Sequence, residues 1–165
     1  MAALNEIARY LLETAASFYL ILTVLRGMLQ LARADFYNPI SQFVVRATNP
    51  PLRVIHRVIP SAGRFDPAVL ILAVLVQVLA IVAQLTLSGF SLPDITSLLI
   101  WSVLGVVGLI INTYLIALVV MIVISWVAPG TRHPAVLLTC QITEPIMSPV
   151  RSMLPSMGGL DFPPI

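Results

Sequence analysis

The chain has 165 residues, of which 59% are hydrophobic and 10% are charged, and its mean hydropathy is +1.00. Soluble domains typically carry about 25% charged residues, so this composition excludes a water-soluble globular domain and predicts an integral membrane protein. The formal net charge of +2 is not gathered on a polar face, and direct nucleic-acid binding is therefore not expected. The single cysteine, Cys140, excludes an internal disulfide and any multi-cysteine metal site.

The first two apolar segments each have the length of a membrane-spanning helix. Residues 7–31 can cross a hydrocarbon core of roughly 30 Å. Arg26, near the end of this segment, either reaches the interface or faces the bundle and meets Asp35 or Asp66. Residues 67–87 contain no charge, and Asp66 with the proline after it is a typical helix start. We therefore expect spans over about 7–31 and 67–87.

The third apolar segment, residues 95–127, would be about 50 Å long as one straight helix. Because this length exceeds the hydrocarbon core, the segment is either one long tilted helix or a short membrane-dipping piece followed by a full span, and we favour a break or a lipid-surface start before about Gly105. The span itself is then predicted over about 108–127, preceded by an apolar segment from residue 95.

Three uncharged polar side chains lie within the predicted spans. Gln77 and Gln84 are seven residues apart, share one helix face and are expected to hydrogen-bond to a neighbouring helix. Asn112 is the one strongly polar residue of the third segment. Transport needs polar groups at the bilayer midplane. This set is small for a carrier acting alone, although an oligomer could still form a pore.

Two polar, proline-rich stretches of the chain resemble each other. Residues 48–66 and 143–161 align without a gap at an offset of 95 residues. The alignment predicts an all-α membrane protein with two tandem repeats, residues 1–87 and 88–165. The residues that are identical in both copies are Thr48 and Thr143, Pro50 and Pro145, Pro60 and Pro155, Ser61 and Ser156, Gly63 and Gly158, and Asp66 and Asp161.

Each predicted repeat contains a transmembrane helix, interfacial amphipathic helices and a second transmembrane helix. The surface elements are residues 36–66 in repeat one and 131–161 in repeat two. Because the first copy of the motif runs into a span, we expect the natural protein to continue past Ile165 into another transmembrane helix, which is missing from this chain.

The surface element of repeat one shows two apolar stripes with helical spacing. We expect the prolines at 50 and 145 in the first turns of helices, the prolines at 60 and 155 at helix ends, and the glycines at 63 and 158 where the chain reverses. Short helices of this kind, apolar on one side and arginine-bearing on the other, suit the headgroup boundary. The first stripe comprises Ile40, Phe43, Val44 and Ala47; the second comprises Leu52, Ile55, Val58 and Ile59, with Arg53, His56 and Arg57 beside it.

Arginine is concentrated in the loop between the first two spans. This loop carries five arginines, whereas the turn between the second and third segments carries Asp94 alone. Positively charged loops face the cytoplasm, so both surface elements are predicted to be cytoplasmic and the N-terminus to lie on the opposite side. The five loop arginines are Arg33, Arg46, Arg53, Arg57 and Arg64.

Three sequence segments resemble the YggT (YlmG) family of bacterial and plastid membrane proteins. They are L-R-G-M-L-Q-L-A-R-A-D-F-Y-N-P-I-S-Q-F (25–43), I-S-W-V-A-P-G-T-R-H-P-A (124–135) and T-E-P-I-M-S-P-V-R-S-M-L-P-S-M-G-G-L-D (143–161). The family pattern is similar to T-x-P-x-x-x-P-x-R-x-x-x-P-x-x-G-G-x-D. The second copy matches it at Thr143, Pro145, Pro149, Arg151, Pro155, Gly158, Gly159 and Asp161.

The first copy departs from this pattern. Val54 stands in place of the middle proline, His56 in place of the arginine, and Arg64 in place of the second glycine. Arg57 could substitute for the missing arginine one position along. The resemblance implies a small multi-span protein of the bacterial inner membrane, with two related halves and usually about four helices. Members of the family are connected with potassium and osmotic homeostasis, with cell division, and in plastids with cytochrome haem attachment and nucleoid distribution.

The two motif copies form the candidate site. Arg57 is expected to pair with Asp66, and Arg151 with Asp161 or Glu144, either to hold the fold or to shape a binding surface. Arginines outside such pairs would bind lipid phosphates or an acidic partner surface. The candidate residues of this partner and lipid surface are Asn49, Pro50, Arg53, Arg57, Pro60, Gly63, Arg64, Asp66, Thr143, Glu144, Pro145, Pro149, Arg151, Pro155, Gly158, Gly159 and Asp161.

Residues for catalysis are scarce. His133 lies seven residues before Cys140, but no third group is placed to orient a base beside the thiol. Haem or metal ligation remains a less favoured alternative, and no catalytic residue, metal or cofactor is predicted. The residues that such ligation would use are His56, His133, Met147, Met153 and Met157.

The sequence therefore predicts a non-enzymatic inner-membrane protein that acts as a scaffold or accessory subunit of a larger membrane assembly. The expected partners are anionic lipid headgroups and either other membrane subunits or further copies of the chain. The alternative is a small protein for ion permeation or for osmotic and potassium homeostasis.

Overall fold

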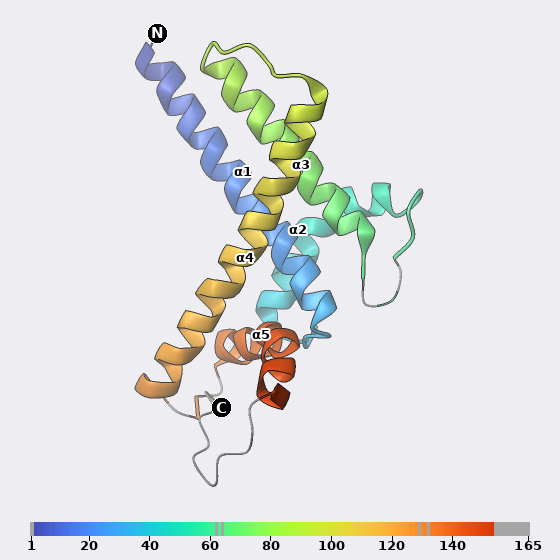
Figure 1. Ribbon diagram of the computed structural model, residues 1–165, viewed down its shortest axis with the longest axis vertical. Helices are drawn as coiled ribbons and strands as arrows, with labels where there is room; N and C mark the ends of the chain where they lie inside the picture. Colours follow the sequence, from blue (N-terminus) through green and yellow to red (C-terminus); the bar gives the residue numbers. More distant parts are fainter. Residues whose placement is uncertain (1, 62, 64, 129, 132, 154–165) are drawn as a thin grey trace.

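The fold consists of five α-helices, and the described part of the chain contains no strand (Figure 1). Three of the helices are long and apolar enough to span a membrane. The computed structural model describes residues 2–61, 63, 65–128, 130, 131 and 133–153. The helices are α1 (Ala2–Leu31), α2 (Pro39–Ile55), α3 (Pro67–Leu87), α4 (Ile95–Val127) and α5 (Pro134–Met153).

Helices α1 and α3 form an antiparallel pair. At one end, Asn5 Nδ2 donates a hydrogen bond to the Leu87 carbonyl at 2.7 Å, so the start of α1 meets the end of α3. At the other end, Gly27 lies so close to Val69 that an added Cβ would be 3.4 Å from its Cγ1 atom. The predicted span 67–87 is confirmed, including its Asp66 cap, whose side chain accepts from the Ala68 amide.

Helix α4 crosses the α1–α3 pair diagonally as one unbroken helix of 33 residues (Figure 1). The predicted break before Gly105 is therefore wrong. A helix interior accepts a glycine at a cost of about 1 kcal/mol, whereas a break in an apolar medium would leave backbone groups without hydrogen bonds. Gly105 instead serves packing, because an added Cβ would lie 2.9 Å from Gln77 Nε2 on α3.

Helices α2 and α5 lie toward the end of the bundle where α1 ends (Figure 1). Each continues through its prolines, so the expectation that Pro50 and Pro145 begin new helices is wrong. A proline inside a helix frees the carbonyl four residues earlier. The carbonyl freed by Pro51 belongs to Ala47, and it accepts from the Tyr19 hydroxyl at 3.5 Å. Helix α2 also ends at Ile55 rather than at Pro60.

The main core joins the second half of α1 to α2 and α5. On α2 the buried residues are Ser41, Val44, Thr48 and Leu52. Of the predicted stripe, Val44 is buried and Ala47 packs against the core, whereas Ile40 and Phe43 lie outside it. Both of those residues are exposed, because α2 presents apolar side chains to its surroundings as well as to the bundle. The buried residues of the main core are Leu22, Val24, Met28, Leu29, Ala34, Val44, Leu138 and Ile142.

Candidate functional site

Helices α2 and α5 are joined to each other at one end of the bundle, and we call them, together with the turn at residues 56–58 that follows α2, the surface shelf. The Asn38 side chain, which caps α2, donates from Nδ2 to the Pro134 carbonyl at the start of α5 (2.7 Å). The backbone amide of Asp35 donates to Gln141 Oε1 at 3.0 Å. These bonds connect segments about 100 residues apart in the sequence. The shelf is therefore one continuous surface.

The shelf exposes arginine and apolar side chains together. Arg46, Arg53 and Arg57 are exposed, and so are the nearby Phe43 and Val54. An apolar body with cationic groups beside it is the composition of a helix at the headgroup boundary. Arg64, which was predicted to belong to this surface, lies outside the described residues.

The polar segment between α2 and α3 is organised by a buried aspartate. Asp66 Oδ2 lies 2.9 Å from His56 Nε2, and its side chain is only 3% exposed. Asp66 Oδ1 also accepts from the Ala68 amide at 3.1 Å. The predicted Arg57–Asp66 pair is therefore wrong. His56, which departs from the family pattern, is the partner of Asp66, while Arg57 is exposed.

Other residues of the first motif copy shape this segment. Gly63 has a φ of +62°, which confirms that the chain reverses at this glycine. The Gly63 carbonyl accepts from Gln30 Nε2 at 3.4 Å, which attaches the turn to α1. Asn49 is half-buried, and Pro50 and Pro60 are exposed.

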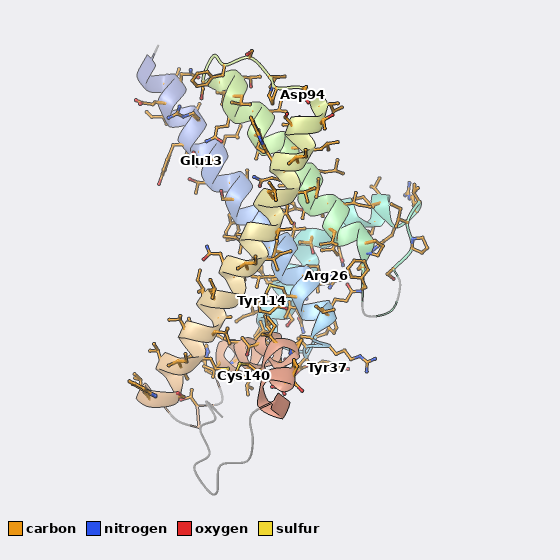
Figure 2. All side chains as sticks on the ribbon, in the orientation of Figure 1. Glu13, Arg26, Tyr37, Asp94, Tyr114 and Cys140 are labelled. Carbon is orange, nitrogen blue, oxygen red and sulfur yellow. The ribbon has the colours of Figure 1, made fainter. Side chains whose placement is uncertain are left out.

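Arg26 lies half-buried near this segment (Figure 2). Its guanidinium sits 5.8 Å from the centre of the Phe36 ring, within reach of a cation–π contact. The charges of Arg26 and Asp66 are close enough to interact. However, Arg26 Nε and Nη1 are buried and have no hydrogen-bond partner among the described residues. Among the described residues Arg26 makes no ion pair with Asp35 or Asp66, so the interpretation in which it meets one of these carboxylates has no direct contact to support it.

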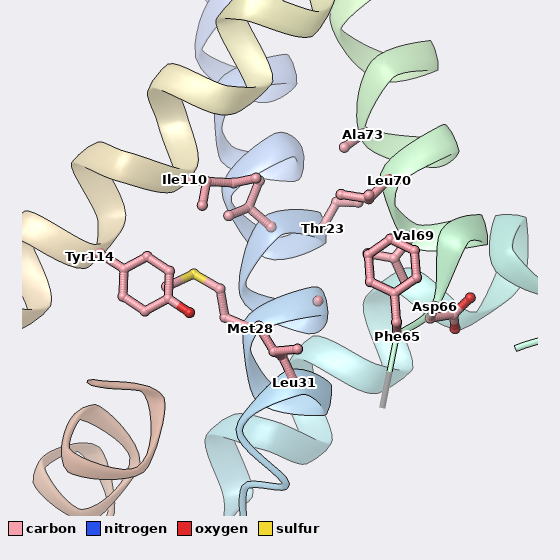
Figure 3. A pocket seen from close by; sticks show the side chains of 12 residues that line it. Thr23, Met28, Leu31, Phe65, Asp66, Val69, Leu70, Ala73, Ile110 and Tyr114 are labelled. Carbon is pink, nitrogen blue, oxygen red and sulfur yellow. The ribbon is translucent and has the colours of Figure 1, made fainter. Parts of the chain in front are cut away.

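An apolar cleft of about 270 Å³ opens beside Asp66, where α1, α3 and α4 meet (Figure 3). We call it the Asp66 cleft. Thr23, Gly27, Met28 and Leu31 contribute from α1, and Asp66 is its one charged lining residue. The remaining lining residues are Val24, Phe65, Val69, Leu70, Ala73, Ile110 and Tyr114. Sequence patterns gave no signal for this cleft, because its walls come from three separate apolar segments.

The amide side chains of the predicted spans do not line the Asp66 cleft. Gln77 and Asn112 line one groove of about 320 Å³ together with Ser17, at the crossing of α1, α3 and α4. Gln84 is exposed and does not join them. Within the described part of the chain neither glutamine makes a hydrogen bond, so the predicted interhelix bonds are wrong for this structure.

The second motif copy is described only in part. Thr143 is buried, and its hydroxyl donates to the Thr139 carbonyl at 3.0 Å. Glu144, Pro145 and Pro149 lie on the exposed side of α5. The remaining residues of this copy are outside the described part: the Arg151 side chain, Pro155, Gly158, Gly159 and Asp161, together with the expected helix beyond Ile165.

The candidate catalytic and metal ligands are separated or already used in hydrogen bonds. His133 Nδ1 accepts from the Ala135 amide at 3.2 Å, where it caps the start of α5. Cys140 is half-buried on α5. Among the residues that the structure describes, no group of three His, Cys, Asp or Glu could hold a metal ion.

Fold and site together define a helical membrane protein, with three candidate spans and a surface shelf joined to one end of them. The family can be named more closely. The pattern of the family CCB3/YggT matches residues 5–87 and 100–165, and the chain belongs to this family.

Relatives from several bacteria support the assignment. The chain is 46% identical over 166 residues to an uncharacterized protein of Pseudomonas aeruginosa, covering 100% of this chain and 84% of that protein. It is 39% identical over 157 residues to the uncharacterized protein YggT of Escherichia coli K12, covering 94% and 80%. A Vibrio alginolyticus protein is 36% identical over 154 residues, covering 93% and 83%. No solved structure was found to match the chain.

Proposed function

We propose that this chain is a non-enzymatic scaffold or accessory subunit of a larger membrane assembly. The observation that carries the proposal is the surface shelf, in which Asn38 and Asp35 fix α2 against α5. A shelf that is tied to the spans and exposes Arg46, Arg53 and Arg57 offers a rigid cationic surface. Such a surface suits anionic headgroups and the acidic surface of a partner subunit.

The proposal includes two related halves. Helices α2 and α5 begin at Pro39 and Pro134, which are 95 residues apart, as the two motif copies are. Their caps also correspond, because Asn38 Oδ1 and His133 Nδ1 each accept from the amide two residues later. The family pattern matches two separate segments of the chain. These correspondences support a duplication in which each half supplies one helix of the shelf.

The proposed setting is the bacterial inner membrane, with the shelf on the cytoplasmic side and the N-terminus on the periplasmic side. Figure 2 shows Asp94 near the end of the molecule that is remote from α5. Arginine on the shelf and an aspartate at the far turn agree with the positive-inside rule. Reactivity of a single introduced cysteine with an impermeant maleimide in intact cells would test this orientation, with Tyr37→Cys and Asp94→Cys in a Cys140→Ser background as the two sites.

Binding of anionic lipid headgroups to the shelf can be tested by measuring how added lipid changes the melting temperature. A lipid that binds the folded state raises its melting temperature. We expect phosphatidylglycerol to raise the melting temperature of the wild-type protein in detergent more than phosphatidylcholine does. The doubly substituted variant Arg53→Gln with Arg57→Gln should lose most of this difference. The control Arg9→Gln removes an arginine near the opposite end of α1 and should keep the difference. Equal behaviour of both variants would contradict the proposal.

Binding of a partner subunit to the shelf needs a separate measurement. In-cell crosslinking followed by affinity purification should recover a defined set of membrane proteins with the wild-type chain. The Arg53→Gln, Arg57→Gln variant should recover less of that set per folded molecule. Loss of yield with unchanged recovery per folded molecule would show that these arginines only hold the fold.

A second function, ion permeation, is favoured by one observation. Ser17, Gln77 and Asn112 come from three helices and line a single groove, and polar groups within the bilayer mark permeation paths in many membrane proteins. Potassium flux through proteoliposomes of the purified chain separates the two functions. Robust flux that is abolished by Asn112→Leu would replace the scaffold proposal.

A further inference from the structure

Helix α4 exposes an amide side chain at a depth where the surroundings are hydrocarbon. Asn112 lies near the midpoint of α4, and Gln77, which lines the same groove, is the middle residue of α3. Both helices are candidate spans, so their midpoints lie near the centre of a bilayer. Asn112 is exposed there, and within the described part of the chain its amide makes no hydrogen bond.

An amide without a partner is unfavourable at this depth. Transfer of an amide into hydrocarbon costs free energy unless a hydrogen bond compensates for the lost water, and polar side chains of membrane spans bond to a neighbouring helix. Ser17 and Gln77 share the groove with Asn112, but among the described residues neither of them bonds to it. The missing partner therefore has to come from the lipid-facing side of α4.

A second copy of the chain supplies such a partner. An amide side chain carries both donors and an acceptor, so two Asn112 side chains related by a two-fold axis can each donate to the other. In a two-fold interface each surface meets the same surface of the other copy, and a charge close to the axis would face its own like charge. Helix α4 contains no charged residue, whereas α1 carries Glu6 and Glu13. This difference favours α4 over α1 as the contact between copies.

The residues around Asn112 form a face that a second helix can approach. Gly108 precedes Asn112 by about one helical turn, it is exposed, and an added Cβ would meet nothing within 4 Å. A small residue at such a position lets two membrane helices come close together. The other side chains of this face are exposed, apolar and spaced three or four residues apart, as on one side of a helix. We call it the α4 face, and it comprises Leu104, Gly108, Asn112, Leu115, Val119 and Ile122.

We propose that the α4 face binds a second copy of the chain, with the two Asn112 amides hydrogen-bonded to each other across a two-fold axis near the bilayer centre. The axis runs perpendicular to the membrane plane, so both copies have the same orientation. The buried residues of α4, which are Ser102, Val106 and Met121, lie on another side of the helix and keep their packing. The interface uses none of the exposed arginines of the shelf, so it stands or falls independently of the scaffold proposal.

Disulfide crosslinking in native membranes locates the contact between copies. Single cysteines are introduced in a Cys140→Ser background at two positions of the α4 face, Leu115→Cys and Val119→Cys. The matched controls are Val103→Cys and Val120→Cys, which are exposed as well but lie about 120° or more around the helix from Gly108. After oxidation, the crosslinked dimer should be at least five times more abundant for the face variants than for the controls. Equal crosslinking at all four positions, or crosslinks from the face to a different protein alone, would overturn the proposal.

Energy transfer between labelled copies in liposomes measures association of the purified chain by itself. Donor and acceptor dyes are attached at Tyr37→Cys in the Cys140→Ser background, since Tyr37 is exposed on the shelf side. Asn112→Leu should weaken association about tenfold, because two interhelix hydrogen bonds are lost. Asn112→Gln keeps an amide and should weaken it less. Gln84→Leu is the matched control, because it removes an exposed amide from another span and should associate like the wild type.

Gly108→Leu separates association from folding. The added side chain has room in the single chain but fills the space that the second helix needs. Association should fall at least tenfold, while circular dichroism and unfolding by dodecyl sulfate stay like those of the wild type. The Arg53→Gln, Arg57→Gln variant should associate normally, which distinguishes this interface from the shelf. Wild-type association of both Asn112→Leu and Gly108→Leu, or an equal loss in Gln84→Leu, would overturn the proposal.

Discussion

Removal of the Asp66 side chain should lower the free energy of unfolding by about 3 kcal/mol. The first contribution is the cap of α3, in which Asp66 Oδ1 accepts from the Ala68 amide at 3.1 Å, and loss of a cap typically costs about 1 kcal/mol. The second is the contact with His56 Nε2 at 2.9 Å. A hydrogen bond to a charged group contributes about 1.5–3 kcal/mol, and we take about 2 kcal/mol because His56 is 32% exposed while Asp66 is 3% exposed. The substitution to test is Asp66→Ala.

A double-mutant cycle separates the two contributions. Unfolding of Asp66→Ala, His56→Ala and the double variant in mixed micelles with increasing dodecyl sulfate, followed by circular dichroism, should give a coupling of about 1–2 kcal/mol. Asp66→Asn should lower the free energy of unfolding less than Asp66→Ala does, because the asparagine amide oxygen can still accept a hydrogen bond from the Ala68 amide at the cap. Arg57 is an exposed neighbour, so the free energy of unfolding of Arg57→Ala should stay within about 0.5 kcal/mol of the wild-type value. Additive effects of His56 and Asp66, or a stronger coupling of Asp66 to Arg57, would refute the pairing.

Two further predictions concern α4. Gly105→Leu should lower the free energy of unfolding by about 1 kcal/mol, the low end for overpacking, since even a Cβ would lie 2.9 Å from Gln77 Nε2 and the flexible Gln77 side chain must move away. The same change at Gly108, where a Cβ meets nothing within 4 Å, should have little effect in the same unfolding assay, and equal losses would contradict the packing. At the start of α4, hydrogen bonds from the Ser97 amide and hydroxyl lower the pKa of Asp94 below its ordinary 3.8. Because the folded pKa is depressed, the stabilisation is present above pH 3.8 and is lost as the pH falls through the folded value. A carbon NMR titration should show Ser97→Ala raising the pKa of Asp94 only part of the way toward 3.8, because the backbone amide bond, the larger cause, remains. An unchanged pKa would contradict the contribution of the hydroxyl.

Sequence patterns predicted the limits of a helix correctly where local composition and capping residues determine them. The limits of 67–87 follow from a charge-free apolar run with an aspartate cap and a proline at its start, and the helix has the same limits. The reversal at Gly63 was also predictable, because its positive φ suits the residue without a Cβ. In these cases the local chemistry and the surrounding structure favour the same conformation.

Tertiary contacts decided the features that sequence patterns missed. Pro50 and Pro51 predict a helix boundary, but a carbonyl freed in α2 receives the hydroxyl of Tyr19 from another helix. The length of residues 95–127 predicts a break before about Gly105, but α4 is one helix and Gly105 packs against Gln77 of α3. His56 departs from the family pattern, and only the folded chain shows that it reaches Asp66. Each outcome depends on a contact between different elements of the fold, which periodicity and propensity do not report.

The offset of 95 residues locates a difference in charge between the proposed halves. Position 26 corresponds to Met121, which is buried and lies 3.3 Å from the Thr143 hydroxyl. Thr48, the counterpart of Thr143, is likewise buried and bonds to its own helix. Under the proposed duplication the two threonines match, whereas a cation stands at this position in the first half alone. The half-buried guanidinium of Arg26 is replaced by a buried thioether at Met121, so the two proposed halves cannot serve the same polar partner through this position.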